Sequence, residues 1–156
     1  MTSAIHAMKV RRSVLLFSCF AAACGAPAQE DAPPGGGGDA PAVTAPSVTI
    51  IAPTDGAFQD EHDVTVWLRS TVPILPAGDM TPGSGHHHLY LDADLGDMTA
   101  PIPTVPGSIV HMGDASSEYV FEDVASGPHR LIAVVADGAH VPLQPLVVDT
   151  VEFVIE

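Results

Sequence analysis

Residues 64–69, Val-Thr-Val-Trp-Leu-Arg, alternate between apolar side chains and side chains with polar atoms. In an extended chain Val64, Val66 and Leu68 fall on one face, and the three residues between them fall on the other. A period of two over this length is typical of an antiparallel strand with one buried face. The stretch therefore predicts a strand that lies against an apolar core.

Other short runs of β-branched and alternating residues repeat this pattern, and no segment shows a sustained apolar period of 3.6. Turn signals such as Gly127-Pro128 and Asp137-Gly138 separate the runs. We expect an all-β, immunoglobulin-like or fibronectin-like antiparallel sandwich of about seven strands over residues 47–156. The expected strands are 48–51, 64–70, 86–93, part of 102–110, 118–124, 129–136 and 147–155.

The start of the chain has the features of an export signal. Lys9, Arg11 and Arg12 precede an apolar run over residues 14–23, which is too short to remain in a bilayer as a spanning helix. Residues 21–25, Ala-Ala-Ala-Cys-Gly, resemble a bacterial lipobox, although the usual residue at Ala21 is Leu. The resemblance implies that residues 1–23 are removed and that Cys24 is lipidated. An ordinary signal peptide cut nearby is the alternative.

Residues 24–46 are rich in Pro and Gly and contain few large apolar side chains. Such a segment buries too little surface to offset the entropy of ordering it, so we expect a disordered tether between a membrane and the domain. Gly25 after the cysteine resembles outer-membrane sorting rather than retention at the inner membrane. The expected location is therefore the bacterial cell envelope, on the outer membrane, through lipid alone.

The net charge of the chain after residue 23 excludes several classes of binding partner. After residue 23 the chain keeps two basic residues, Arg69 and Arg130, and all 19 acidic ones, which gives a formal charge of −17. Nucleic acid and anionic membrane surfaces are therefore excluded as partners. The chain has no lysine after Lys9 and no cysteine after Cys24, so lysine chemistry, disulfides and further thiolate ligands are excluded. An acidic surface attracts cations, although solubility or adaptation to salt would also explain it.

Five histidines belong to segments that the expected topology brings to one end of the sandwich, where three connections meet. They are His86, His87, His88, His111 and His140. Neutral imidazoles suit zinc and copper ions. Strand alternation places His86 and His88 on a shared face and turns His87 inward, so we expect one or two of these three to bind.

Carboxylates are expected near the same end. Glu118 or Asp137 would serve as a ligand or as an acceptor for an imidazole N–H. Met80 and Met112 could add a thioether, although ordinary apolar packing is the simpler interpretation. His62 and His129 belong at the opposite end, where we expect an exposed loop residue and a packed corner residue, respectively.

Four motifs follow one another in a fixed order: residues 85–92, Gly-His-His-His-Leu-Tyr-Leu-Asp; residues 111–118, from His111 to Glu118; residues 127–131, from Gly127 to Leu131; and residues 137–142, Asp-Gly-Ala-His-Val-Pro. Together they resemble the bacterial secreted domain of unknown function 4399, over most of residues 48–155. The chain departs from that family at residues 115–117 and at Arg130. The resemblance implies an exported β domain with histidine-centred motifs and supplies no established activity.

Three functions remain open at this point. The first is a lipid-anchored envelope domain that binds a divalent or copper ion through clustered histidines. The second is a non-catalytic immunoglobulin-like adhesion or envelope-assembly module, in which the histidines only order loops. The third is a metal-dependent hydrolase or oxidase with Glu118 as base. We do not expect an enzyme, because no nucleophile motif is present and the domain is small for a substrate cleft.

Overall fold

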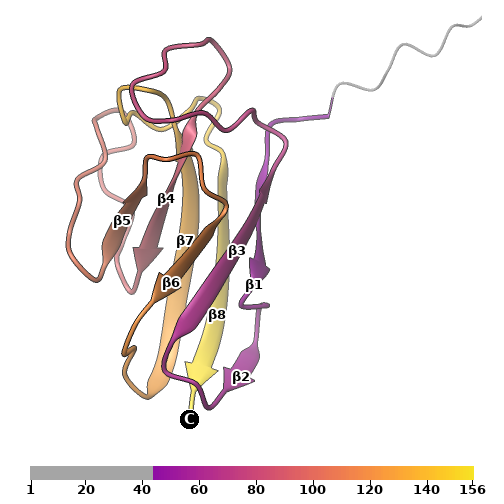
Figure 1. Ribbon diagram of the computed structural model, residues 1–156, viewed down its shortest axis with the longest axis vertical. Helices are drawn as coiled ribbons and strands as arrows, with labels where there is room; N and C mark the ends of the chain where they lie inside the picture. The colour runs from indigo at the N-terminus through magenta and orange to yellow at the C-terminus, as the bar shows by residue number, and fades with distance from the viewer. Residues whose placement is uncertain (1–43) are drawn as a thin grey trace, which may run out of the picture. The chain divides into compact units, whose positions relative to one another are not determined.

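The computed structural model describes residues 44–156 (Figure 1). The predicted signal peptide, Cys24 and most of the predicted tether lie outside the described residues. Within residues 44–156 the regular elements are all strands, and no helix there is long and apolar enough to cross a membrane. The strands are β1 (Val48–Ala52), β2 (Ala57–Gln59), β3 (Val64–Ser70), β4 (His86–Leu91), β5 (Ile109–Met112), β6 (Glu118–Phe121), β7 (Gly127–Ala136) and β8 (Val148–Ile155).

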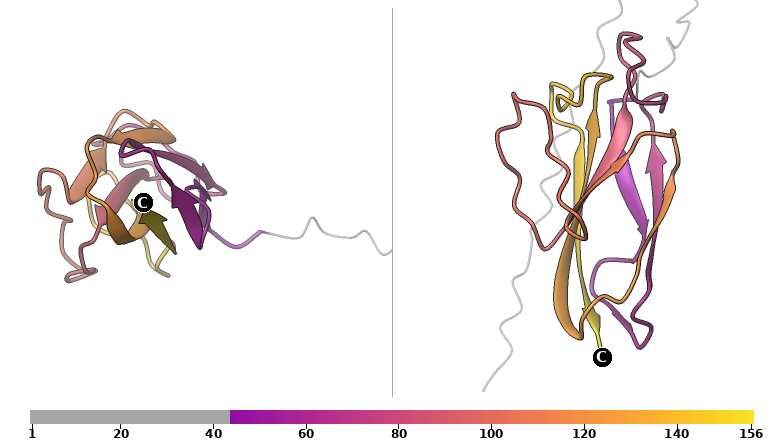
Figure 2. Two further views of the ribbon diagram at one scale, coloured as in Figure 1. Left: turned by 90° about the horizontal axis from the view of Figure 1, so that it is seen from below. Right: turned by 60° about the vertical axis from the view of Figure 1, so that its left-hand side comes forward.

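The strands form two sheets that face each other, as the right-hand view of Figure 2 shows. One sheet has the order β1-β3-β6, and the other has the order β2-β8-β7-β4-β5. Neighbouring strands are antiparallel except β2, which runs parallel to β8. The predicted all-β sandwich is therefore confirmed.

The main core fills the space between the sheets. Val64, Val66 and Leu68 point into it from β3, as the alternation predicted, while Trp67 on the other face stays exposed. Tyr119 and Phe121 also point inward from β6. Each large apolar side chain buried here contributes roughly 1.5–3 kcal/mol by its removal from water.

Three strand predictions need correction. β2 was not predicted, because residues 57–59 show no alternation and the strand forms only by pairing with β8. The strand expected over residues 86–93 ends at Leu91, because Asp92 has a left-handed backbone with φ of 52°. The strand expected within residues 102–110 is β5, which begins only at Ile109.

A second apolar cluster lies on the outer face of the five-stranded sheet. It contains Tyr90, Ile102, Ile109, Ile132, Val134 and Ala136. Ile102 belongs to the long connection between β4 and β5, which lies on the side of this sheet away from the three-stranded sheet (Figure 2, right). Because the three-stranded sheet covers one face of β4 and this connection lies over the other, all six residues of β4 are buried, including its histidines.

Candidate metal centre

Four histidines from three segments meet on the outer face of the five-stranded sheet. His86 and His88 lie on this face of β4, and His88 is the cross-strand partner of His111 on β5. His140 reaches the same place from the connection between β7 and β8. His111 was expected in a connection but lies within β5, so the cluster sits on a sheet face near the end of the sandwich rather than among loops alone.

The four rings are close enough to share one ion. One ligand nitrogen from each ring lies within 4.8 Å of the corresponding nitrogen of every other ring. The Nε2 atoms of His86 and His88 are 3.0 Å apart, and Nε2 of His86 is 3.2 Å from Nδ1 of His140. The six distances between ring centroids run from 4.6 to 5.7 Å. A zinc–nitrogen bond measures about 2.0–2.1 Å, so these separations are compatible with ligands around a common centre.

Hydrogen bonds among the four rings leave some of their nitrogen atoms without a partner. A neutral imidazole has one N–H and one lone pair, and Nε2 of His86 faces two other ring nitrogens at once. Within the described residues, Nδ1 of His86, Nδ1 of His88 and Nε2 of His111 are buried without a hydrogen-bond partner. Buried polar atoms without partners are uncommon and call for an explanation such as a bound ion.

Burial favours the neutral form of three of the four rings, those of His86, His88 and His111. Burial, reinforced by the neighbouring histidines, lowers the pKa of His88 to about 3 and that of His86 to about 4. Burial also lowers the pKa of His111, with His140 acting in the same direction. The nearby carboxylates Asp137 and Asp114 oppose these shifts at His86 and His111 without reversing them. Neutral imidazoles are the form that binds metals.

A tight turn sets the position of His140. Asp137 Oδ1 accepts hydrogen bonds from the backbone N–H groups of Ala139 and Val141, and its carbonyl accepts one from the N–H of His140. His140 has a φ of 68°, which is uncommon outside glycine, Asn and Asp and is often found at functional sites. The carbonyl of His140 accepts a bond of 2.9 Å from Ile102 N–H, which ties this turn to the covering connection.

A second connection joins the segments that carry His111 and His140. In the loop between β3 and β4, the N–H of Ala77 donates to Gly113 O at 2.9 Å, and the N–H of Gly78 donates to Gly138 O at 3.0 Å. A Cβ at Gly138 would collide with the backbone carbonyl of Asp79. The loop can bond to both segments only because Gly138 lacks a side chain.

Comparison with known proteins supports one assignment. A family model for a domain of unknown function, DUF4399, matches residues 64–156. The chain belongs to this family. No curated protein and no solved structure gives a significant match to the chain. The matched region begins at β3 and contains all four clustered histidines and the three connections that position them.

His87 of this DUF4399 domain does not join the cluster, although it was predicted as a possible ligand. It lies on the opposite face of β4, where it pairs with Met112 and Val135 and points between the sheets. Its Nδ1–H donates to the carbonyl of Ser116 at 3.0 Å, and burial lowers its pKa. Met112 is buried on the same inner face, so its thioether does not reach the four histidines.

The two predicted carboxylates have other partners. Glu118 is exposed on β6 and lines a shallow hollow with His111, but its carboxylate makes no hydrogen bond to a histidine ring in the described part of the chain. Asp137 acts through its bonds to the turn at His140, so it positions a histidine without contacting its ring nitrogens. Met80 is exposed beside Gly138.

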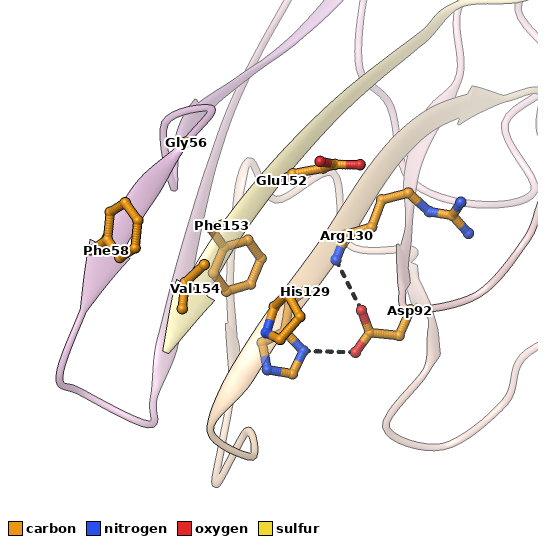
Figure 3. Close-up of a pocket in the computed structure, with 9 residues that line it drawn as sticks. Gly56, Phe58, Asp92, His129, Arg130, Glu152, Phe153 and Val154 are labelled. Atoms are coloured by element: carbon orange, nitrogen blue, oxygen red, sulfur yellow. Dashed lines mark hydrogen bonds and ion pairs between the residues drawn. The ribbon is translucent and has the colours of Figure 1, made fainter. Parts of the chain in front are cut away.

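The other two histidines among the described residues serve local structure. His129 lies near the start of β7, with Nδ1 2.7 Å from Asp92 Oδ2 and Nε2 2.8 Å from Ala125 O. Asp92 also accepts a bond from the backbone N–H of Arg130, and both contacts lie in a pocket that Phe58, Glu152 and Phe153 also line (Figure 3). His62 is exposed and its Nδ1–H donates to Val124 O.

Proposed function

We propose that this DUF4399 domain binds one zinc or copper ion through His86, His88, His111 and His140. The observation that carries the proposal is the convergence of four ring nitrogens within 4.8 Å from three separate segments. A cation placed between the rings could accept one lone pair from each of the four nitrogens. Imidazole nitrogen is a favoured ligand of both ions.

Burial strengthens the argument. His86 and His88 are at most 1% exposed, and their Nδ1 atoms lack partners. An unsatisfied buried polar group destabilises a fold by about 1–3 kcal/mol. His129, which has a local structural role, uses both ring nitrogens in hydrogen bonds to groups outside any histidine cluster. An ion at the centre would bind the Nε2 atoms of His86 and His88, which face other ring nitrogens.

We further propose that the domain is held in the bacterial cell envelope, on the outer membrane, by lipid attached to Cys24. The lipobox-like residues 21–25 and the Pro- and Gly-rich residues 24–46 support this location. In the full chain, Cys24→Ala should move the protein from the membrane fraction to the soluble fraction. Retention of the variant in membranes would argue against the lipid anchor.

We propose a non-catalytic role for the ion. Catalytic zinc sites keep one position open for water, whereas four protein ligands close a tetrahedral site. Residues 44–156 hold no cysteine or lysine that could act as a nucleophile beside the cluster. The domain would therefore hold or carry its ion rather than use it in hydrolysis.

Elemental analysis tests metal binding. The full chain, purified without a polyhistidine tag, should contain close to one equivalent of zinc or copper after incubation with the ion and gel filtration. His88→Ala combined with His140→Ala should abolish this stoichiometry, whereas His62→Ala should keep it. No metal in the parent chain and an unchanged melting temperature with chelator would favour the alternative, an adhesion or envelope-assembly module.

A further inference from the structure

We infer that the ion bound at this centre is monovalent copper, Cu⁺, in preference to Zn²⁺ and Cu²⁺. The inference rests on the proposed function and specifies its ligand. Two independent features of the cluster carry it. One is the arrangement of the four rings in space, and the other is the absence of negative charge among the donors.

The arrangement of the rings is close to tetrahedral. In a square of four rings, the two diagonals would be about 1.4 times as long as the four edges, as expected for the tetragonal sites that suit Cu²⁺ and Ni²⁺. Here the longest centroid distance, between His88 and His140, is 5.7 Å, and the shortest, between His111 and His140, is 4.6 Å. The other four distances lie between 4.9 and 5.2 Å.

A tetrahedral arrangement of ligands favours ions that have no energetic preference for another coordination geometry. Zn²⁺ has a filled d shell and no geometric preference of its own, and the same electron count applies to Cu⁺. Cu²⁺ favours tetragonal geometry and would have to distort either itself or the cluster. The rings are held on a buried strand, a neighbouring strand and a tied turn, which limits how far they can rearrange.

The charge of the ion distinguishes Zn²⁺ from Cu⁺ at this centre. The four candidate ligands are neutral imidazoles, with no carboxylate or thiolate among them. A bound Zn²⁺ would therefore keep its full double charge, whereas Cu⁺ would bring a single charge. The cost of burying an ion rises with the square of its charge in a simple continuum picture, so a neutral donor set favours the lower charge.

The surroundings of the cluster are apolar on the sheet side. Ala136 is the cross-strand neighbour of His86, and Val134 is that of His88. Tyr90 follows on the same face of β4, and Ile102 packs with Tyr90, Val134 and Ala136 in the apolar cluster on this face. None of these side chains brings a negative charge to compensate a divalent ion.

The nearby carboxylates of Asp137 and Asp114 accept hydrogen bonds from backbone N–H groups. Asp137 Oδ1 bonds to two backbone N–H groups, and Asp114 Oδ1 accepts the N–H of Ser116 at 3.0 Å. Carboxylate partners would make the ligating imidazoles more basic, and the Nδ1 atoms of His86 and His88 have none in the described residues.

Competition titrations test the inference on the full chain. The dissociation constants for Cu⁺, kept reduced by ascorbate without oxygen, and for Cu²⁺ and Zn²⁺ are measured against chelators of known affinity. We expect Cu⁺ to bind at least roughly tenfold more tightly than either divalent ion, a difference of about 1.4 kcal/mol. Tighter binding of Zn²⁺ or Cu²⁺ at the same four histidines would overturn the inference and leave the proposed function intact. Absence of all three ions would overturn both.

A variant in which one ligand carries a negative charge tests the argument that neutral donors favour Cu⁺ over Zn²⁺. His140→Asp keeps a donor at this position but makes it anionic, and Asp tolerates the left-handed backbone there. The ratio of Zn²⁺ affinity to Cu⁺ affinity should rise by at least tenfold. His111→Asp makes the same change on β5. It replaces His140→Asp in this experiment if His140→Asp lowers the melting temperature strongly. An unchanged ratio in a folded variant would contradict the charge argument.

Discussion

Nε2 of His86 lies 3.2 Å from Nδ1 of His140, although 54 residues separate the two histidines. His86 begins β4, and His140 lies in the turn after β7. The two strands are neighbours in the five-stranded sheet, and His86 is paired with Ala136, the last residue of β7. The contact therefore depends on sheet register and on the turn that Asp137 holds, and it exists only in the folded domain.

Metal should stabilise the folded domain, because the unfolded chain does not hold the four rings together. An ion present at 100 times its dissociation constant should raise the free energy of unfolding by about 2.7 kcal/mol. For a domain of this size the melting temperature should rise by roughly 10 °C. Circular dichroism melts with and without ion, followed by addition of chelator, measure the effect.

The matched variants separate specific from general binding. His88→Ala should remove most of the metal-induced rise in melting temperature, because it deletes a buried ligand on β4. His62→Ala should retain the full rise, because His62 is exposed and bonds only to Val124 O through its ring. An equal rise in both variants would indicate binding at other groups.

Gly113 should be essential for the position of His111. A Cβ added at Gly113 would lie 2.5 Å from Cε1 and 2.7 Å from Nε2 of the His111 ring, and 3.2 Å from Cβ of Ala77. Gly113→Ala should therefore displace the ring, destabilise the domain by about 1–3 kcal/mol and weaken metal binding. Urea titrations and metal titrations measure the two effects.

Gly96 provides the matched control for this substitution. It belongs to the covering connection, and a Cβ there would meet nothing within 4 Å. Gly96→Ala should therefore leave both the free energy of unfolding and the metal affinity close to those of the parent chain. Similar losses in Gly96→Ala and Gly113→Ala would mean that the Gly113 effect does not come from contact with His111.

Period-two alternation predicted the faces of the strands well, because side-chain direction in a strand is set by local geometry. It placed Val64, Val66 and Leu68 in the core, and it put His86 and His88 on one face with His87 on the other. The convergence of His111 and His140 with this face followed from strand order alone. These features need no knowledge of side-chain packing.

The burial of the histidines and the loop contacts around them depend on tertiary packing, which leaves no local pattern in the sequence. Residues 86–88 are polar, yet they are buried, because the connection over residues 92–108 lies over the outer face of β4 and the other sheet covers His87. Nothing in the Pro-rich sequence of this connection indicates where it packs. The bonds from Ala77 and Gly78 to Gly113 and Gly138 were likewise not predicted. Glycines beside histidines in the motifs at residues 111–118 and 137–142 were the available signal, since close approach of two backbones requires glycine.

Asp92 should contribute to stability without affecting the metal centre. Its carboxylate accepts the Nδ1–H of His129 at 2.7 Å and the N–H of Arg130 at 2.9 Å, so it joins the end of β4 to β7. Asp92→Ala leaves both donors without this acceptor and should lower the free energy of unfolding by about 1–3 kcal/mol. Metal stoichiometry should stay unchanged, and a loss of stoichiometry in the folded variant would contradict the separation of the two regions.

Acid should destabilise the metal-free domain through His86 and His88. Their pKa values fall from 6.5 to about 4 and about 3 on folding, mainly because burial disfavours the charged ring. The unfolded chain therefore binds more protons below pH 6.5, and stability falls as pH falls through this window. Each histidine contributes up to about 1.4 kcal/mol per pH unit once its unfolded form is fully protonated, so the two together should remove roughly 3 kcal/mol between pH 6.5 and 5.

The control for this pH dependence removes one titrating ring. His88→Leu places an apolar side chain at the buried position and should reduce the slope of unfolding free energy against pH, because one of the rings with a lowered pKa no longer titrates. Urea unfolding of metal-free protein at pH 7, 6 and 5 measures both slopes. Above pH 5 most carboxylates remain ionised, so their contribution is small in this range. A flat profile in the parent chain would show that these two rings are protonated as readily in the folded state as in the unfolded state.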